Sequence, residues 1–136
     1  MVRRLDGYHW PCSPPYIRVM KKHERLLAWQ RARELVLAIY EASGRWPDSE
    51  RFGLTSQVRR AAVSVAANIA EGSAKQVPPA FRRFLDIALG SLAEISCLLT
   101  LAHDLTLLAD ESWQAIEAKR DSAAAVTWLL YKSMLP

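Results

Sequence analysis

The chain of 136 residues is long enough for one domain with a substantial core, and its composition, 51% hydrophobic and 24% charged, is typical of a globular protein. No uninterrupted apolar run reaches about 18 residues, and the N-terminus lacks the apolar segment of a secretory signal. We therefore expect neither a membrane span nor export. Cys12 and Cys97 match no metal-binding or disulfide spacing, which favours a cytoplasmic protein.

The net charge of +4 is unevenly distributed along the chain. Residues 1–83 carry 15 Lys and Arg against 7 Asp and Glu, a net charge of +8, whereas residues 84–136 carry 3 against 7, a net charge of −4. From Met20 onward the net charge is only +2. This split fits a basic surface that meets an anionic partner, and it equally fits two halves that attract one another.

The first 20 residues contain three prolines and show no helical periodicity. We predict that residues 1–20 form a disordered or loosely packed N-terminal extension. Met20, which two lysines follow, is a candidate for the true translation start. We place the folded domain at residues 21–136.

A first helix is predicted over Glu24–Ala42, where apolar residues recur at three- and four-residue spacing. Gly44 is expected to end this helix in the left-handed C-cap conformation that glycine tolerates. The connection that follows contains Trp46 and Phe52. We expect both aromatic side chains to pack on the end of a helical bundle, which would make the connection ordered.

The second predicted helix, Leu54–Glu71, is apolar except at Arg59 and along one narrow polar stripe. The stripe consists of Gln57, Arg60, Ser64, Asn68 and Glu71. This balance predicts a helix that is buried on most sides, whose polar groups find partners on neighbouring helices. Gly72 is expected to form its C-cap.

Two further helices are predicted over Pro79–His103 and Asp110–Ser133. The third helix carries a wide apolar face and, on another side, a polar file of Arg83, Asp86, Gly90 and Glu94. Glycine inside a helix costs about 1 kcal/mol, so we expect Gly90 to allow the close approach of another helix. Asp110 and Ser112 are candidate caps for the fourth helix.

Four long helices with short connections predict an all-α fold, an antiparallel up-down-up-down four-helix bundle. We expect Arg60 to pair with a carboxylate of the third helix, with Glu94 as the first candidate. If that pair is buried, the loss of one partner would cost about 3–5 kcal/mol. A helix-turn-helix unit over Val65–Ala88 is disfavoured because these helices are too long and too apolar.

Residues that could carry catalysis are sparse. The sequence has no glycine-rich phosphate loop, no dinucleotide fingerprint and no Glu-x-x-His pair for a di-metal site. His103 beside Asp104 resembles half of a catalytic or metal pair, although a histidine at a helix C-terminus more often complements the helix dipole. Glu71, Asp86 and Glu94 alternate with arginines, which fits ion pairs better than a nuclease metal site. We predict no catalytic residue, no metal site and no cofactor.

Lysine and arginine supply most of the sequence-independent affinity of proteins for nucleic acids. The candidates for phosphate contact are Lys21, Lys22, Arg25, Arg31, Arg33, Arg45, Arg51, Lys75, Arg82 and Arg83. The alternative is that many of them are solvated surface charges.

Two segments, QVRRAAVSVAANIAEGSA and FRRFLDIALGSLAEI, carry a specific family resemblance, and LLAWQRARELVLAIYEASGRWPDSERFGL before them fits it. The chain from about Lys22 to Ser133 closely resembles the four-helix-bundle proteins encoded in intervening sequences of bacterial large-subunit ribosomal RNA genes. The signature positions are occupied by Arg59, Arg60, Asn68, Glu71, Gly72, Ser91 and Glu94. The stripes on which these residues lie favour a structural role for them.

The resemblance implies a bundle that assembles into a ring-like homopentamer. It also implies a relationship to the accessory protein of diversity-generating retroelements, a bundle pentamer that associates with nucleic acid and a reverse transcriptase. From these points we predict a non-enzymatic, oligomeric scaffold that binds RNA or other nucleic acid through a basic surface. A protein–protein adaptor is the alternative, and an RNA-processing enzyme is the least supported interpretation.

Overall fold

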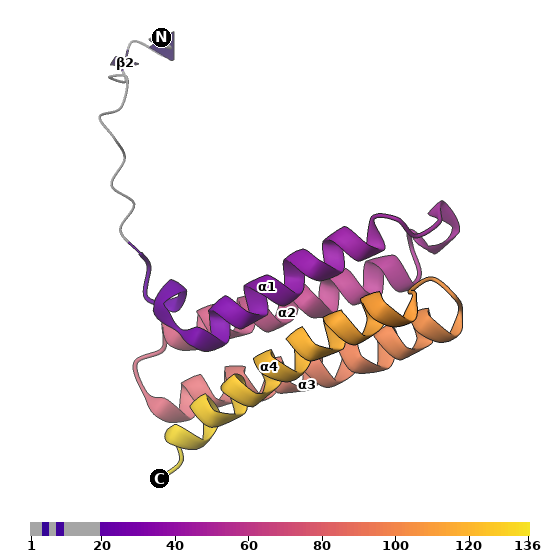
Figure 1. Ribbon diagram of the computed structural model, residues 1–136. Coiled ribbons are helices and arrows are strands. Elements are labelled where there is room, and N and C mark those ends of the chain that lie inside the picture. Colours follow the sequence, from indigo (N-terminus) through magenta and orange to yellow (C-terminus); the bar gives the residue numbers. More distant parts are fainter. Residues whose placement is uncertain (1–3, 6–7, 10–19) are drawn as a thin grey trace.

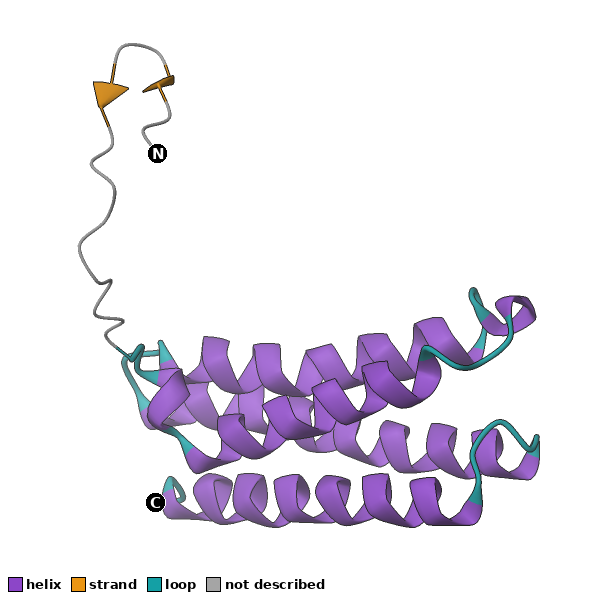
Figure 2. Cartoon of the chain, turned by 45° about the horizontal axis from the view of Figure 1, so that its top comes forward, coloured by secondary structure: helices purple, strands orange, loops and turns teal. Residues whose placement is uncertain are grey.

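Four long helices lie side by side in the computed structural model, which describes residues 4–5, 8–9 and 20–136 (Figure 1). The helices are α1 (Leu27–Ser43), α2 (Leu54–Ser73), α3 (Pro78–Asp104) and α4 (Asp110–Ser133). Each helix packs against the one before it and runs in the opposite direction, and α1 also packs against α4 (Figures 1 and 2). The predicted all-α antiparallel four-helix bundle is therefore confirmed.

Four shorter elements complete the described part of the chain. Strands β1 (Arg4–Leu5) and β2 (Tyr8–His9) pair antiparallel. Two 3₁₀ turns, η1 (His23–Arg25) and η2 (Asp48–Glu50), precede α1 and α2. Apart from β1, β2 and Met20, the predicted extension at residues 1–20 lies outside the described residues.

The first helix begins later than predicted because the chain is interrupted at Leu26. Leu26 is extended, with φ −79° and ψ 127°, so Glu24 belongs to η1 and α1 starts at Leu27. The Glu24 carboxylate accepts a hydrogen bond from the Lys21 backbone N–H at 2.9 Å, and the Gln30 side chain donates to the Glu24 carbonyl at 2.9 Å. The Gln30 bond satisfies the Glu24 carbonyl, which a continuous helix would have paired internally, and the Glu24 carboxylate satisfies a backbone N–H that precedes η1.

The core runs along the bundle axis, and α3 supplies four of its nine largest fully buried apolar side chains, more than any other helix. The largest fully buried apolar residues are Leu35, Ile39, Ile69, Leu85, Leu92, Ile95, Leu99, Val58 and Val65. By length and composition alone α3 could cross a membrane, but a core helix of a soluble protein meets the same criterion. Its buried side chains pack against the rest of the bundle, so this criterion is weak evidence for a membrane span.

The prediction that α2 is buried on most sides is wrong for the single chain. Its polar stripe faces the outside, where Gln57, Arg60 and Glu71 are exposed, and Val63 on another outward side is 44% exposed. The reason is geometric. A helix in a four-helix bundle has only two neighbours, α1 and α3 in this case, and its outer face stays open.

None of the three glycines that the sequence analysis singled out acts as expected. Gly44 is right-handed, with φ −62°, and Gly72 lies inside α2 rather than after it. A Cβ atom on Gly72 would lie 2.6 Å from Phe81 Cδ2 and 2.9 Å from Phe84 Cβ, so Gly72 serves close packing. A Cβ atom on Gly90 would meet nothing within 4 Å, so no helix of the same chain approaches it.

The left-handed residue at a helix end is Thr106, with φ 61°. The Thr106 N–H donates to the His103 carbonyl at 2.9 Å, and the Leu107 N–H donates to the Ala102 carbonyl at 2.8 Å. These are the two hydrogen bonds of a Schellman motif, in which threonine occupies the position that glycine usually takes. The turn from α3 to α4 is therefore fixed by backbone hydrogen bonds.

The connection between α1 and α2 is ordered, but only one of its aromatic side chains packs as predicted. Trp46 is buried in the core, whereas Phe52 is 88% exposed. The Arg51 guanidinium lies 5.4 Å from the centre of the Phe52 ring, so this ring contacts a neighbouring cation and not the bundle end. The Asp110 carboxylate contacts His103, and no side chain caps the N-terminus of α4.

Replacing Gly72 with alanine tests the close packing between α2 and α3. Although alanine favours helices, we expect Gly72→Ala to lower the free energy of unfolding by about 1–3 kcal/mol, because the new methyl group overlaps Phe84. The matched control, Gly90→Ala, adds the same atom in open space and should raise stability by about 1 kcal/mol. Urea unfolding followed by circular dichroism measures both, and equal changes would contradict the packing role.

Candidate nucleic-acid interface

The antiparallel topology separates charge between the two ends of the bundle. Residues 20–25, 71–86 and 131–136 meet at the end that carries the C-terminus and η1, which we call the basic end (Figure 1). They contain seven Lys and Arg and three Asp and Glu, a net charge of +4. Residues 41–53 and 103–111 form the opposite, acidic end, with two Arg and six Asp and Glu, a net charge of −4.

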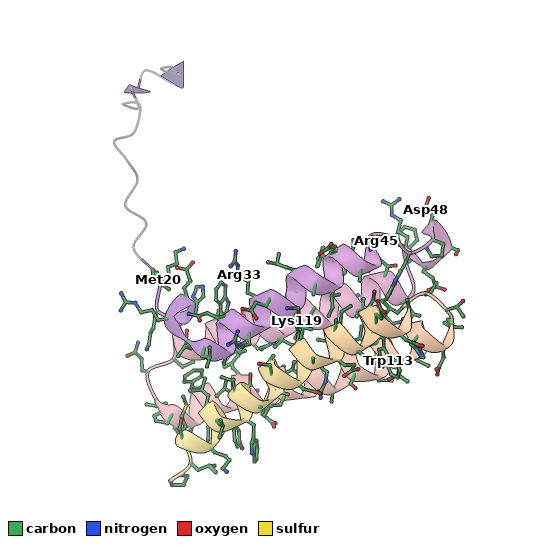
Figure 3. The ribbon with its side chains drawn as sticks, in the orientation of Figure 1. Met20, Arg33, Arg45, Asp48, Trp113 and Lys119 are labelled. Atoms are coloured by element: carbon green, nitrogen blue, oxygen red, sulfur yellow. The ribbon has the colours of Figure 1, made fainter. Side chains whose placement is uncertain are left out.

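The structure brings most of the predicted phosphate-contacting residues together. Six of the ten candidates lie at the basic end, namely Lys21, Lys22, Arg25, Lys75, Arg82 and Arg83. Arg31 and Arg33 follow in the next turns of α1, whereas Arg45 and Arg51 lie at the acidic end, as Figure 3 shows for Arg33 and Arg45. The candidates therefore form one group of eight and a separate pair.

Some of the cations at or near the basic end already have contacts within the chain. Arg82 donates to the Met134 carbonyl, which links the start of α3 to the end of α4. The Lys75 ammonium lies 5.1 Å from the centre of the Phe84 ring, and Arg31 contacts the Glu34 carboxylate at 3.2 Å. A phosphate group would have to compete with these contacts for the three side chains.

Five other cations keep their charge free. Within residues 20–136, their side chains form no hydrogen bond or ion pair with another side chain. These residues are Lys21, Lys22, Arg25, Arg33 and Arg83. Four of the five are at the basic end, and all five are exposed. Exposed and unpaired cations can approach phosphate groups without first breaking a contact inside the protein.

The two arginines at the acidic end have a different setting. Arg45 lies 3.7 Å from the Glu41 carboxylate, and Arg51 covers the ring of Phe52. Asp48 and Glu50 add further negative charge in η2 (Figure 3). Arg45 and Arg51 are thus the weakest of the ten candidates for phosphate contact.

The residues of the family signature have mainly structural contacts. Ser64 of α2 and Ser91 of α3 share a hydrogen bond of 3.0 Å between their hydroxyl groups. The Asn68 amide donates to the Ser64 carbonyl at 2.8 Å and to its hydroxyl at 3.0 Å. Arg59 Nε donates to the Ser43 hydroxyl at 2.8 Å, which joins α2 to the end of α1.

The predicted ion pair between Arg60 and Glu94 is absent from the described part of the chain. Both side chains are exposed and line an open hollow of about 340 Å³ between α2 and α3, together with Gln57. Because both side chains are exposed to solvent, each charge can be hydrated separately, and neither needs the other as a partner. The expected cost of 3–5 kcal/mol for breaking a buried pair therefore does not apply.

Ion pairs within α4 that the sequence analysis missed are hydrogen-bonded to α3. The Arg120 guanidinium contacts the Glu117 carboxylate at 3.2 Å and the Leu92 carbonyl at 3.5 Å, and it also contacts Asp121. The Ser96 hydroxyl donates to Glu117 at 3.1 Å. The three-residue spacing of Glu117 and Arg120 on one helix is the sequence signal that could have revealed the pair.

His103 does not have the geometry of a catalytic base. Its Nε2 atom is hydrogen-bonded to Asp110, its Nδ1 atom lies 3.8 Å from Asp104, and its ring stacks on Trp113 at 4.0 Å between centres. With both ring nitrogens directed at carboxylates, the imidazole holds the turn between α3 and α4. Within the described residues, no group of three or more His, Cys, Asp and Glu side chains is placed to hold a metal ion.

Fold and surface together define an all-α four-helix bundle whose charge is separated between its ends. The sequence profile of the 23S rRNA-intervening sequence protein family matches residues 24–127, and the chain belongs to that family. A protein of unknown function from the S23 ribosomal protein family of Bacteroides thetaiotaomicron has a similar crystal structure, with a TM-score of 0.73 and 20% sequence identity. The match covers 78% of this chain and 99% of that one. Curated protein sequences gave no match, and neither description names an enzymatic activity.

Two double-mutant cycles test whether Arg60 and Glu94 are uncoupled and whether Glu117 and Arg120 are coupled. Alanine substitutions at Arg60 and Glu94 should show a coupling energy below about 0.5 kcal/mol, because both charges are solvated. Substitutions at Glu117 and Arg120 should show about 1 kcal/mol or more, because this pair is partly buried and shares further hydrogen bonds. Denaturant unfolding of the four single and two double variants gives both values. A larger coupling for Arg60 and Glu94 would contradict the structural assignment.

Proposed function

We propose that this protein is a non-enzymatic, oligomeric scaffold of the cytoplasm that binds RNA or another nucleic acid through its basic end. The observation that carries the proposal is the separation of charge, +4 at one end of the bundle and −4 at the other. From Met20 onward the net charge is only +2. If this charge were spread evenly over the surface, it would attract an anionic polymer only weakly. Its concentration at one end gives a directed positive surface.

The positive surface fits contact with a phosphate backbone. Lys21, Lys22 and Arg25 come from η1 and the residues before it, while Arg83 comes from the first turns of α3. Cations from two separate segments can meet several phosphates at once, and each contact releases counterions from the nucleic acid. Binding of this kind depends little on base sequence and weakens steeply as salt is added.

Assembly into an oligomer would multiply this surface. An apolar hollow of about 280 Å³ on α1 and α2 is open to water in the single chain. It is lined by Trp29, Arg33, Val36, Leu37, Val63, Ala66, Ala67 and Ala70. We propose that a second copy of the chain covers this hollow, in the homopentameric ring that the family resemblance implies, so that several basic ends act together on one polymer.

Charge reversal at the two ends tests the proposed interface. Lys22→Glu with Arg83→Glu should lower affinity for a structured RNA by about tenfold or more and reduce the slope of log affinity against log salt by about 2, because two phosphate contacts are lost. The matched variant, Arg45→Glu with Arg51→Glu, changes the net charge equally but at the acidic end, and it should have a much smaller effect. Equal losses would show that net charge acts regardless of position, and circular dichroism checks that both variants remain helical.

A charged substitution inside the apolar hollow tests assembly. Val63→Glu should shift the molar mass measured by light scattering from an oligomer towards the single chain, because the interface would have to bury a carboxylate. Leu105→Glu, at a residue that is 57% exposed outside the hollow, is the control and should remain assembled. If Val63→Glu also stays oligomeric, the hollow is free for a different protein, which is the outcome that the adaptor hypothesis requires.

A further inference from the structure

Two aromatic rings stack on the outside of α4 near its C-terminal end. The rings of Trp128 and Tyr131 are 9° from parallel, with their centres 5.5 Å apart. Trp128 is nevertheless 48% exposed, although an indole of its size is usually more fully buried. The pair therefore presents a flat aromatic surface to the solvent.

This aromatic pair lies beside the basic end. Trp128 is six residues before Met134, which corresponds to about 9 Å along the helix. Met134 accepts the hydrogen bond from Arg82, so the first turns of α3 are close by. Lys132 lies one turn after Trp128 on the same side of α4, and Asp121, two turns before Trp128, is paired with Arg120. Lys132 therefore places a positive charge one helical turn from the indole.

We propose that Trp128 and Tyr131 form a stacking platform for an unpaired base of single-stranded nucleic acid, whose phosphates contact the cations of the basic end. This inference rests on the proposed nucleic-acid function and narrows it to single-stranded segments. An exposed aromatic face flanked by lysine and arginine is the combination that binds single strands without sequence preference. Bases in a duplex are already stacked on one another and cannot occupy such a face.

The stacking geometry distinguishes this surface from an aliphatic docking patch. Tyr131 covers part of one face of the indole in an offset parallel arrangement, which a base on the open part of the indole would extend. Leu129, which is 62% exposed on a different side of α4, offers apolar area without a ring. It therefore serves as a control that separates stacking from general apolar contact.

The test compares Trp128→Ala, Trp128→Phe and Leu129→Ala. The full chain is titrated with a short single-stranded RNA of mixed sequence and with the same sequence as a duplex. Trp128→Ala should weaken single-strand binding by about fivefold or more, with duplex binding changed by less than about twofold. Trp128→Phe should keep most of the single-strand affinity because a phenyl ring still stacks, and Leu129→Ala should resemble the unchanged protein. The indole fluorescence that Trp128→Phe removes should be quenched by single strands in the unchanged protein.

Each other outcome overturns the inference in a recognisable way. If Trp128→Ala binds single strands as well as the unchanged protein, the platform is wrong while the basic interface stands. If Trp128→Ala weakens single strands and duplex equally, or Leu129→Ala has the same effect, Trp128 acts through folding or assembly, which light scattering on the same samples shows. If the unchanged protein binds neither RNA, both this inference and the proposed function fail.

Discussion

The close packing of α2 against α3 is the constraint on which the rest of the structure depends. Small residues at the contact let the two helices approach, above all Gly72 beneath Phe81 and Phe84, and the hydroxyl groups of Ser64 and Ser91 meet across it. Once these helices are joined by a four-residue connection, they must run antiparallel. The amphipathic helices α1 and α4 then bury their apolar sides on the exposed core of this pair, and both ends of the bundle are defined.

The same topology converts an ordering of charge along the sequence into a separation of charge in space. Basic residues are concentrated near the start of the domain and around the connection between α2 and α3, and an up-down bundle brings these two segments to one end. The acidic residues of η2 and of the turn between α3 and α4 are brought to the other end. Of the two interpretations that the charge asymmetry allowed, mutual attraction of the two halves gains no support from direct ion pairs between them in the described part of the chain. Within the described residues the ion pairs instead join residues close in sequence, as in Glu117 with Arg120.

Hydrophobic periodicity was sufficient to predict the fold, because it depends only on which face of each helix is apolar. It predicted four helices, and the bounds of α3 and α4 agree within one residue at each end. It failed at helix ends, where the backbone conformation of a single residue decides how the helix terminates. Gly44 and Gly72 are typical C-cap residues, yet both remain right-handed or helical, while the left-handed turn falls on Thr106. A backbone hydrogen-bonding pattern such as the Schellman motif leaves no mark on the sequence when threonine replaces glycine.

The candidate interface was predictable as a list of residues but not as a surface. The sequence cannot show that Arg82 is engaged by Met134 while Arg83 beside it is free, because that difference depends on where the end of α4 lies. For the same reason Trp128 was assigned no role, since its exposure depends on which side of α4 faces α1 and α3. Trp128 is 48% exposed, so burying the remainder of its side chain would contribute roughly 1–2 kcal/mol that packing within the single chain does not gain. The proposed stacking of an unpaired base would cover this exposed part of the indole with a partner from outside the chain. In that proposal, the positive charge of the basic end favours an anionic partner with flat rings over a purely apolar one.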